Sequence, residues 1–332
     1  TVGEIMAWII GWDLILEMLM AGSVISKYWG VYLNDFMRLM GWNANTNLTF
    51  GSFHIDIAPI IIVAFFTTLL VFGTKIGARV DGAMTVLKIA IVFFVVIVGF
   101  FYVKASNFTP FIPPSQPAST VEGSSAVTGV MTQPLWQFAT GMTPSVYGVP
   151  GILSGAALVF FAFIGFDVVA TASEETKNPH KNVPLGIGVG MLLIIVMYML
   201  VAVVTTGMVS YADLAKQDSP SLATAFELVG ADWAAKIISF GIVLGLATVV
   251  MVALVAAFFD IGVLSDMVNI GTLSAFTLVA ISIPIMRKKR PDLPRAFKMP
   301  GSPWIPILIA VANFWLMLNL SVLTWIRFVV WL

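Results

Sequence analysis

The chain alternates between long apolar runs and short polar segments. A membrane-spanning helix needs about 20 mostly apolar residues. The runs that meet this requirement lie at residues 2–25, 56–74, 83–103, 152–173, 185–208, 235–258, 267–286 and 304–330. They are too long and too uniformly apolar for the strands of a barrel, so they predict helices. We expect an all-α polytopic membrane protein with a single transmembrane domain over residues 1–332.

Composition identifies the lipid bilayer as the medium. The sequence is 59% hydrophobic and 10% charged, whereas soluble domains carry about 25% charged residues. Its formal net charge is zero, which gives no reason to expect a nucleic-acid partner. Cysteine is absent, and His54 and His180 lie far apart, so we expect no disulfide, metal site or cofactor. The chain opens with Thr1 inside an apolar run, so we expect its natural start to lie upstream.

Basic residues predict which loops face the cytoplasm, because lysine and arginine accumulate on that side. Loops 105–150 and 209–233 carry few of them and are expected outside. Loop 105–150 is rich in Pro, Ser, Thr and Gly, which favours a long, flexible extracellular loop. The basic residues gather in three segments, at Lys75 and Arg79, at Lys177 and Lys181, and at 287–298.

The side assigned to these loops conflicts with the number of spans. Loops 177–183 and 287–298 should both lie inside, and 185–208 is one crossing between them, so residues 234–286 must cross an odd number of times. A single crossing would leave many apolar residues of this segment outside the span. Three crossings would need about 60 residues plus turns, which is more than residues 234–286 provide. Sequence missing near Val255–Ala256 would resolve the conflict. A re-entrant hairpin and one long, tilted helix are the alternatives.

Several ionisable side chains fall within the predicted spans, where they are costly and indicate function. Asp13 and Glu17 lie one turn apart on one helix face. They predict a polar stripe that faces a water-filled cavity. Alternatively, Asp13 bonds Trp12 or a neighbouring helix and only fixes how the helices pack. Lys88 is either a proton carrier, because desolvation makes a buried lysine release its proton readily, or a lysine that extends to the cytoplasmic headgroups. Asp260 can simply mark the end of a span.

The segment FFAFIGFD at 160–167 places Gly165 and Asp167 near the middle of a span. Backbone groups that a broken membrane helix leaves free must face a cavity or a ligand. The ends of the two half-helices can then bind the carboxylate and the ammonium of a zwitterion. The alternative is that Gly165 only allows another helix to pack closely.

Four stretches resemble the cationic amino acid transporter family of the amino acid–polyamine–organocation superfamily. They are GEIMAWIIGWDLILE (3–17), VFFAFIGFDVVATASEETKNPHKNVPLGI (159–187), VNIGTLSAF (268–276) and RKKRPDLPRAFKMPGSPWIPIL (287–308). The resemblance covers nearly all of the chain outside loop 105–150. It implies a partial inverted-repeat fold of the leucine-transporter type. The spans then correspond to helices three to eight, ten and eleven, with helices one and two and parts of eight and nine absent.

The resemblance also implies function: secondary active transport of an amino acid through the plasma membrane, often coupled to protons. It implies that the sixth helix is broken at the substrate, with Gly165 and Asp167 at the break. Met251, which would bound the side-chain pocket, is apolar, which favours a small neutral amino acid over a long cationic one. Glu17 could still offer a counter-charge, so a cationic amino acid is the alternative substrate. The matching substrate-binding positions are Phe161, Ala162, Ile164, Glu17 and Met251, and the matching proton-coupling position is Lys88.

Two other functions fit the same residues. One is a membrane protein that binds or senses an amino acid without transporting it. The other is an inactive, truncated remnant, because the family's first helix supplies half of the substrate contacts and has no counterpart here. No nucleophile–base pair or metal-binding group is visible in the sequence, so we do not expect an enzyme.

Overall fold

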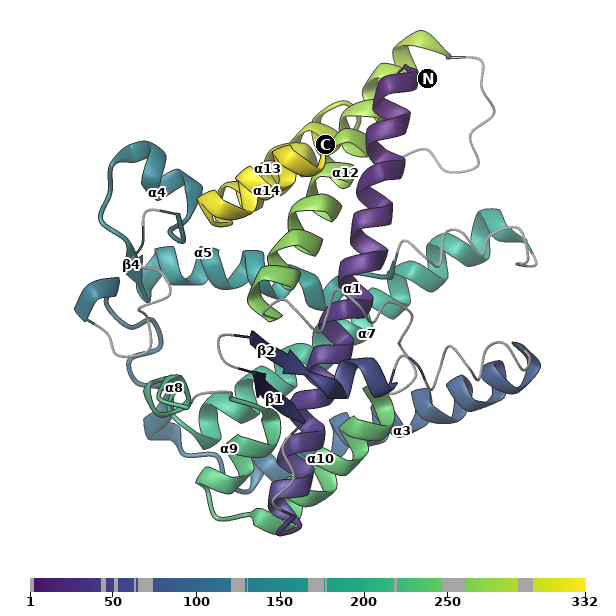
Figure 1. Ribbon diagram of the computed structural model, residues 1–332. Coiled ribbons are helices and arrows are strands. Elements are labelled where there is room, and N and C mark those ends of the chain that lie inside the picture. Colours follow the sequence, from purple (N-terminus) through teal and green to yellow (C-terminus); the bar gives the residue numbers. More distant parts are fainter. Residues whose placement is uncertain are drawn as a thin grey trace. The chain divides into compact units, whose positions relative to one another are not determined.

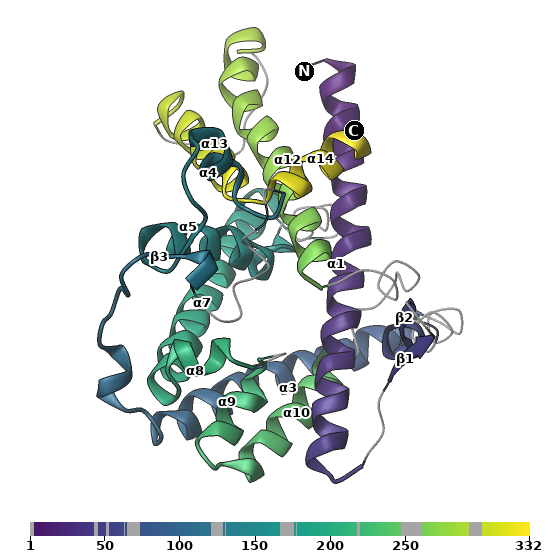
Figure 2. The same ribbon diagram turned by 60° about the vertical axis from the view of Figure 1, so that its left-hand side comes forward.

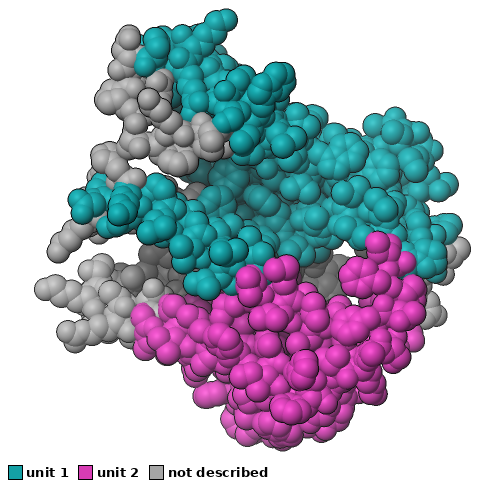
Figure 3. Space-filling view, turned by 180° about the vertical axis from the view of Figure 1, so that it is seen from behind, with its two compact units in different colours: residues 1–18, 113–195, 265–332 teal, residues 19–112, 196–264 magenta. Residues whose placement is uncertain are grey.

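A computed structural model describes most of the chain as helices (Figure 1). The described residues are 3–42, 46–50, 53–62, 64, 74–120, 129, 131–166, 176, 178–217, 220–246, 261–291 and 301–332. They fall into two compact units, coloured separately in Figure 3. Unit 1 consists of residues 1–18, 113–195 and 265–332, and unit 2 of residues 19–112 and 196–264.

The helical class predicted from the apolar runs is confirmed. Within the part of the chain that the structure describes, four helices are long and apolar enough to cross a membrane, at Glu4–Leu39, Gly82–Phe100, Lys181–Met208 and Leu264–Lys289. The longer helices are α1 (Glu4–Leu39), α3 (Thr74–Phe100), α5 (Gly148–Val159), α7 (Pro179–Met208), α10 (Asp232–Leu246), α12 (Ile261–Lys289), α13 (Trp304–Leu318) and α14 (Val322–Trp331). The short helices are η1 (Ala105–Phe108), η2 (Ala118–Thr120), α4 (Leu135–Thr140), η4 (Phe160–Phe163), α8 (Tyr211–Ala215) and α9 (Leu222–Leu228). Among the described residues, β1 (Asn47–Phe50) pairs antiparallel with β2 (Phe53–Asp56), and β3 (Gln116–Pro117) pairs antiparallel with β4 (Ser145–Val146).

Helix α1 continues well beyond the predicted end of its span at residue 25. Its sequence contains no proline, and the charges of its second half find partners in unit 2. Lys27 lies 3.8 Å from Asp56, and Arg38 lies 2.8 Å from Glu227. The helix stops at Gly41, whose positive φ of 80° is a conformation that favours glycine. Tertiary ion pairs, which an apolar run does not reveal, therefore set the length of this helix.

The predicted span 304–330 is two helices, separated at residues 319–321. Ser321 caps α14 by accepting a hydrogen bond from the Thr324 backbone N–H. Backbone groups at the break bond outside their own helix: the Leu135 N–H donates to the Leu320 carbonyl at 3.0 Å, and the Val322 N–H donates to the Gln133 carbonyl at 3.2 Å. These bonds replace the helical bonds that are lost where the chain turns.

The same bonds join residues 320–322 to the described part of loop 105–150. Its described part includes η1, η2, the paired strands β3 and β4, and α4, and the side chain of Gln137 on α4 is fully buried. Backbone partners at 320–322, distant in sequence, thus bond part of this segment. That loop 105–150 is flexible and extracellular stays a prediction.

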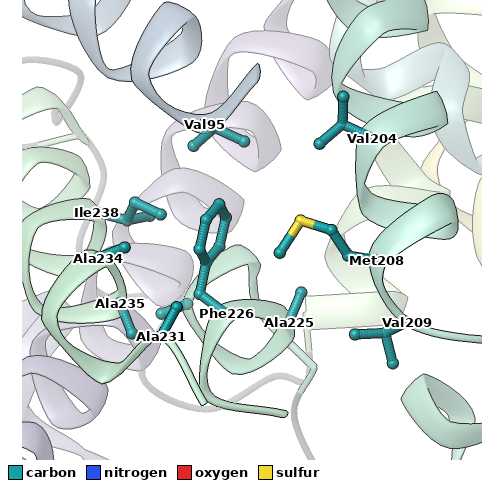
Figure 4. Close-up of a cluster of buried hydrophobic side chains, with 11 residues drawn as sticks. Val95, Val204, Met208, Val209, Ala225, Phe226, Ala231, Ala234, Ala235 and Ile238 are labelled. Carbon is teal, nitrogen blue, oxygen red and sulfur yellow. The ribbon is translucent and has the colours of Figure 1, made fainter. Parts of the chain in front are cut away.

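Unit 2 has an apolar core around Phe226, drawn in Figure 4. Phe226 belongs to α9, which begins at Ser221 with reciprocal hydrogen bonds to Thr224. Helices α3, α7 and α10 surround it. The buried residues of this core are Val95, Val204, Met208, Val209, Ala223, Ala225, Phe226, Ala231, Ala234, Ala235 and Ile238.

Candidate functional site: the interrupted segment after α5

Helix α5 is interrupted where the sequence predicted a broken helix. It ends at Val159, and residues 160–163 form a single tighter turn, η4. Ile164 is then extended, with φ −64° and ψ 141°, and Gly165 has φ +109°. Apart from its chain neighbours, no atom of the described residues lies within 4 Å of where a Cβ on Gly165 would be, and its positive φ is a conformation that favours glycine. Asp167 lies outside the described residues.

The candidate substrate-binding residues of this helix lie on the interrupted segment itself. Ala162 is exposed, and Phe161 and Ile164 are half-buried. The last hydrogen bond of the turn runs from the Ile164 N–H to the Phe161 carbonyl, at 3.2 Å. Their part in binding stays a prediction. Met251, expected to bound the side-chain pocket, and Asp260 both lie outside the described residues.

Helix α12 contacts α5 and the interrupted segment from one face. Asn269 is fully buried, and its Nδ2 donates to the carbonyls of Ala157 (3.0 Å) and Leu158 (3.3 Å), in the last turn of α5. Two helical turns further along, the ring of Phe276 lies 6.2 Å from that of Phe160 and 5.3 Å from that of Phe166, between centroids. Helix α12 therefore contacts the chain on both sides of the interruption.

Helix α12 also meets the first half of α1, in the same unit, and Figures 1 and 2 both show the two helices side by side. A Cβ on Gly271 would lie 3.2 Å from Leu16 Cδ2 and 3.5 Å from the Asp13 carbonyl oxygen, so the helices are close at this glycine. Asp13 and Glu17 are both fully buried. Asp13 and the interrupted segment thus both contact α12, and Glu17 lies one turn beyond Asp13 on α1.

Lys88 lies in unit 2, on α3, and is half-buried. The helix begins at Thr74, nine residues before the predicted span, so Lys88 stands near the middle of its 27 residues. Its aliphatic chain runs past Gly245 of α10, where an added Cβ would be 3.1 Å from Lys88 Cγ. Lys88 lines a pocket of about 160 Å³ whose other lining residues are apolar or glycine. They are Ile91, Val92, Val95, Val201, Leu222, Gly241, Ile242, Gly245 and Leu246.

Sequence reasoning did not single out Asn269. It lies in the quoted motif VNIGTLSAF, and an amide inside the predicted span 267–286 was a signal that it needs a partner. Thr272 of the same motif is also fully buried, but its hydroxyl donates to the Val268 carbonyl of its own helix, at 3.0 Å. Among the described residues, no group of histidine, aspartate and glutamate side chains could hold a metal ion.

Comparison with known proteins gives two family matches and many relatives. Residues 1–261 match the family model described as "Amino acid permease", and residues 297–332 match the one described as "C-terminus of AA_permease". The branched-chain amino acid permease BcaP of Bacillus subtilis is 35% identical over all of this chain and 75% of its own length. The methylthioribose transporter of the same organism is 32% identical with the same coverage. Cationic amino acid transporter 3, mitochondrial, of Arabidopsis thaliana is 30% identical over 86% of this chain and 50% of its own length.

The alignment with BcaP is relevant to the conflict between the number of predicted spans and the side assigned to the basic loops. The alignment with BcaP runs over 382 positions, which exceeds the 332 residues of this chain by 50. At least that many positions of the relative therefore have no counterpart within this chain. The predicted point of missing sequence, Val255–Ala256, lies outside the described residues and stays a prediction.

Proposed function

Because this chain belongs to the amino acid permease family, whose members are transporters and not enzymes, we propose that it carries a small neutral amino acid in symport with protons. The chain is a multi-pass membrane protein of that family. One observation carries the proposal: the helix interruption at Ile164 and Gly165. An interrupted helix offers backbone N–H and C=O groups to the charged ends of a zwitterion, as transporters with discontinuous helices do.

We propose that the amino acid lies against Phe161, Ala162 and Ile164, with Glu17 near its ammonium. The exposure of Ala162 supports this, since a small side chain leaves the backbone accessible. Glu17 supports it as well, because it is a buried carboxylate on α1, the helix that meets α12 at Gly271. Gly165 and Asp167 take part by ending one half-helix and beginning the next.

The proposed side-chain preference is for neutral, aliphatic amino acids. Met251 offers no partner for a guanidinium or ammonium, and an unpaired charge in an apolar pocket is costly. The relative at 35% identity is named a branched-chain amino acid permease, which supports the same class. The test compares binding of L-alanine, L-valine, glycine, L-arginine and L-lysine to the purified protein. Tight binding of L-arginine without L-alanine or L-valine would contradict this preference.

We propose that Lys88 carries the coupled proton. Its place mid-helix, beside a pocket lined otherwise by apolar residues and glycine, disfavours a permanently charged amine. When charged, the amine bridges helix carbonyls as a bound cation does. When neutral, it releases them, so protonation shifts the balance between two conformations.

The proton hypothesis is tested with Lys88→Ala in reconstituted vesicles. Substrate binding should survive, while uptake driven by an imposed pH gradient should fall to the level of empty vesicles. Uptake that still rises with the gradient at near wild-type level would exclude Lys88. Binding without any uptake by the unaltered protein would instead favour a sensing role.

We also propose that the protein resides in the plasma membrane, with loops 105–150 and 209–233 outside. Labelling of intact cells with an impermeant lysine reagent should then modify Lys216 in preference to the lysines at 287–298. The opposite pattern would reverse the orientation.

A further inference from the structure

A pocket of about 580 Å³ lies in unit 2 where α3 and α7 end. Both helices contain a stretch long and apolar enough to cross a membrane, and they end at Phe100 and Met208. Their ends are joined, because the Lys104 backbone N–H donates to the Gly207 carbonyl at 2.9 Å. The side chain of Asn107 adds bonds of 2.8 Å and 3.1 Å to the carbonyls of Gly207 and Met208. Two membrane-crossing helices therefore end together here, which places the pocket at the depth where hydrocarbon gives way to lipid headgroups.

Three charged side chains line this pocket, and two of them pair with each other. The Asp213 carboxylate lies 3.2 Å from the Lys216 ammonium and accepts a hydrogen bond from the Ser210 hydroxyl at 2.7 Å. The third, Lys104, is exposed, and among the described residues it forms no ion pair. The pocket thus has one ammonium in excess, which favours an anionic ligand.

The helix ends at this pocket act in the opposite sense, because the last carbonyls of a helix carry partial negative charge. Their effect is reduced at the end of α7. The Gly207 carbonyl accepts bonds from both Lys104 and Asn107, which use its two lone pairs, and the Met208 carbonyl accepts a bond from Asn107. The Lys104 ammonium is then the strongest attraction that the pocket offers an anion.

The same pocket is also lined by large apolar side chains that stand out from the protein. Phe101 is 81% exposed and Leu228 is 45% exposed. An exposed phenylalanine gains nothing in water, whereas at the edge of a membrane it is buried by acyl chains. A ligand that matches both parts of the pocket has an anionic head and an apolar tail, as a phospholipid has.

We propose that this pocket binds an anionic phospholipid. The phosphate group of the lipid pairs with the Lys104 ammonium, and the adjoining acyl chain packs on Phe101 and Leu228. A dissolved phosphate ion has the same charged chemistry but no acyl chain, so it would use the lysine alone. None of these residues binds the amino acid or the proton in the proposed function, so the inference does not depend on that function.

The test measures binding of phosphatidylglycerol to the whole chain in detergent micelles, by native mass spectrometry at increasing lipid concentration. Phosphatidylcholine, whose headgroup has no net charge, is the comparison lipid and should bind more weakly. Lys104→Gln should raise the dissociation constant of phosphatidylglycerol about fivefold, the effect of one lysine near a charged membrane surface. Phe101→Ser should raise it about as much, because it removes a contact with the acyl chain. Both side chains are exposed, so neither substitution disturbs the core.

Lys236→Gln is the matched control, since Lys236 is an exposed lysine of the same unit that does not line the pocket. It should leave the dissociation constant within about twofold of that of the unaltered protein. An equal loss of binding in Lys236→Gln would mean that general surface charge, and not the pocket, attracts the lipid. Equal binding of the two lipids would remove the role of the charge. Either result would overturn the proposal.

A second measurement distinguishes a lipid from a free phosphate ion. Reductive methylation of Lys104, relative to that of Lys236 in the same sample, should slow about fivefold when phosphatidylglycerol is added to nanodiscs of phosphatidylcholine. Inorganic phosphate added to the phosphatidylcholine nanodiscs should leave the relative rate unchanged. Equal protection of Lys104 by inorganic phosphate would assign the pocket to a free ion and contradict the lipid site. Protection by neither would show that the pocket binds no phosphate group.

Discussion

Both units bury apolar side chains, but among the described residues the fully buried acids and amides lie in unit 1, whereas the fully buried polar residues of unit 2 are serines. In unit 2, the cluster around Phe226 is made of apolar residues, and alanines let its helices approach closely (Figure 4). In unit 1, buried polar residues lie on α12 (Asn269 and Thr272) and on the half of α1 that α12 meets (Asp13 and Glu17). An apolar cluster gains stability from burial alone, whereas buried polar groups are costly unless they have partners or a use. We infer that the cluster around Phe226 contributes packing and propose that α12 organises the binding segment, while Lys88 remains the proposed functional residue of unit 2.

The largest effect should follow from emptying the unit 2 core. Phe226→Ala removes a side chain that is 1% exposed, and a phenylalanine truncated in a core costs about 3–5 kcal/mol. We expect the free energy of unfolding, measured in mild detergent, to fall by that amount. Below the new melting temperature, the dissociation constant for L-valine should stay unchanged.

The matched control is Phe111→Ala, at a phenylalanine of the same unit that is 85% exposed. It should change stability by less than about 0.5 kcal/mol. A Phe226 variant that stays as stable as the Phe111 variant, or that loses amino acid binding while folded, would remove the distinction between the two regions.

Replacing Phe276 of unit 1 should lower stability by less than Phe226→Ala does, but it should also weaken amino acid binding. Phe276→Ala removes ring contacts to Phe160 and Phe166, and such aromatic pairs contribute about 0.5–1.5 kcal/mol each beyond their burial. Because these rings lie on either side of the interruption, the dissociation constant for L-valine should rise about tenfold, by calorimetric titration.

The control for Phe276 is Phe314→Ala in the same unit, which removes a ring contact to Trp325 on the neighbouring α14. It should lower stability without changing binding. Equal losses of binding in the two variants would mean that the contacts of α12 have no special relation to the interrupted segment.

Sequence patterns predicted the parts of this molecule that depend on local properties. Apolar length predicted the helices, and Gly165 predicted the interruption, because both signals lie within the segment concerned. The end of α1 at Leu39 and the split between α13 and α14 depend on ion pairs and backbone bonds to distant segments. Asn269 was missed for the same reason: its residue type signals a need for a partner, but the partner lies on α5, more than a hundred positions away.

The smallest effect is expected at the surface of unit 2, where polar contacts remain in water. A hydrogen bond from Ser210 and the neighbouring ammonium of Lys216, 3.2 Å away, lower the pKa of the Asp213 carboxyl. A carboxyl whose pKa is lower in the folded state than in the unfolded state adds stability above the unfolded pKa. It loses this contribution as the pH falls through the folded pKa. The side chain is fully exposed, so solvent screens the contribution. Asp213→Asn should therefore lower the melting temperature slightly at neutral pH, and the difference from the unaltered protein should vanish in acid. L-valine binding should match that of the unaltered protein throughout, and a change in binding as large as that of Phe276→Ala would show that the polar surface of unit 2 also takes part in function.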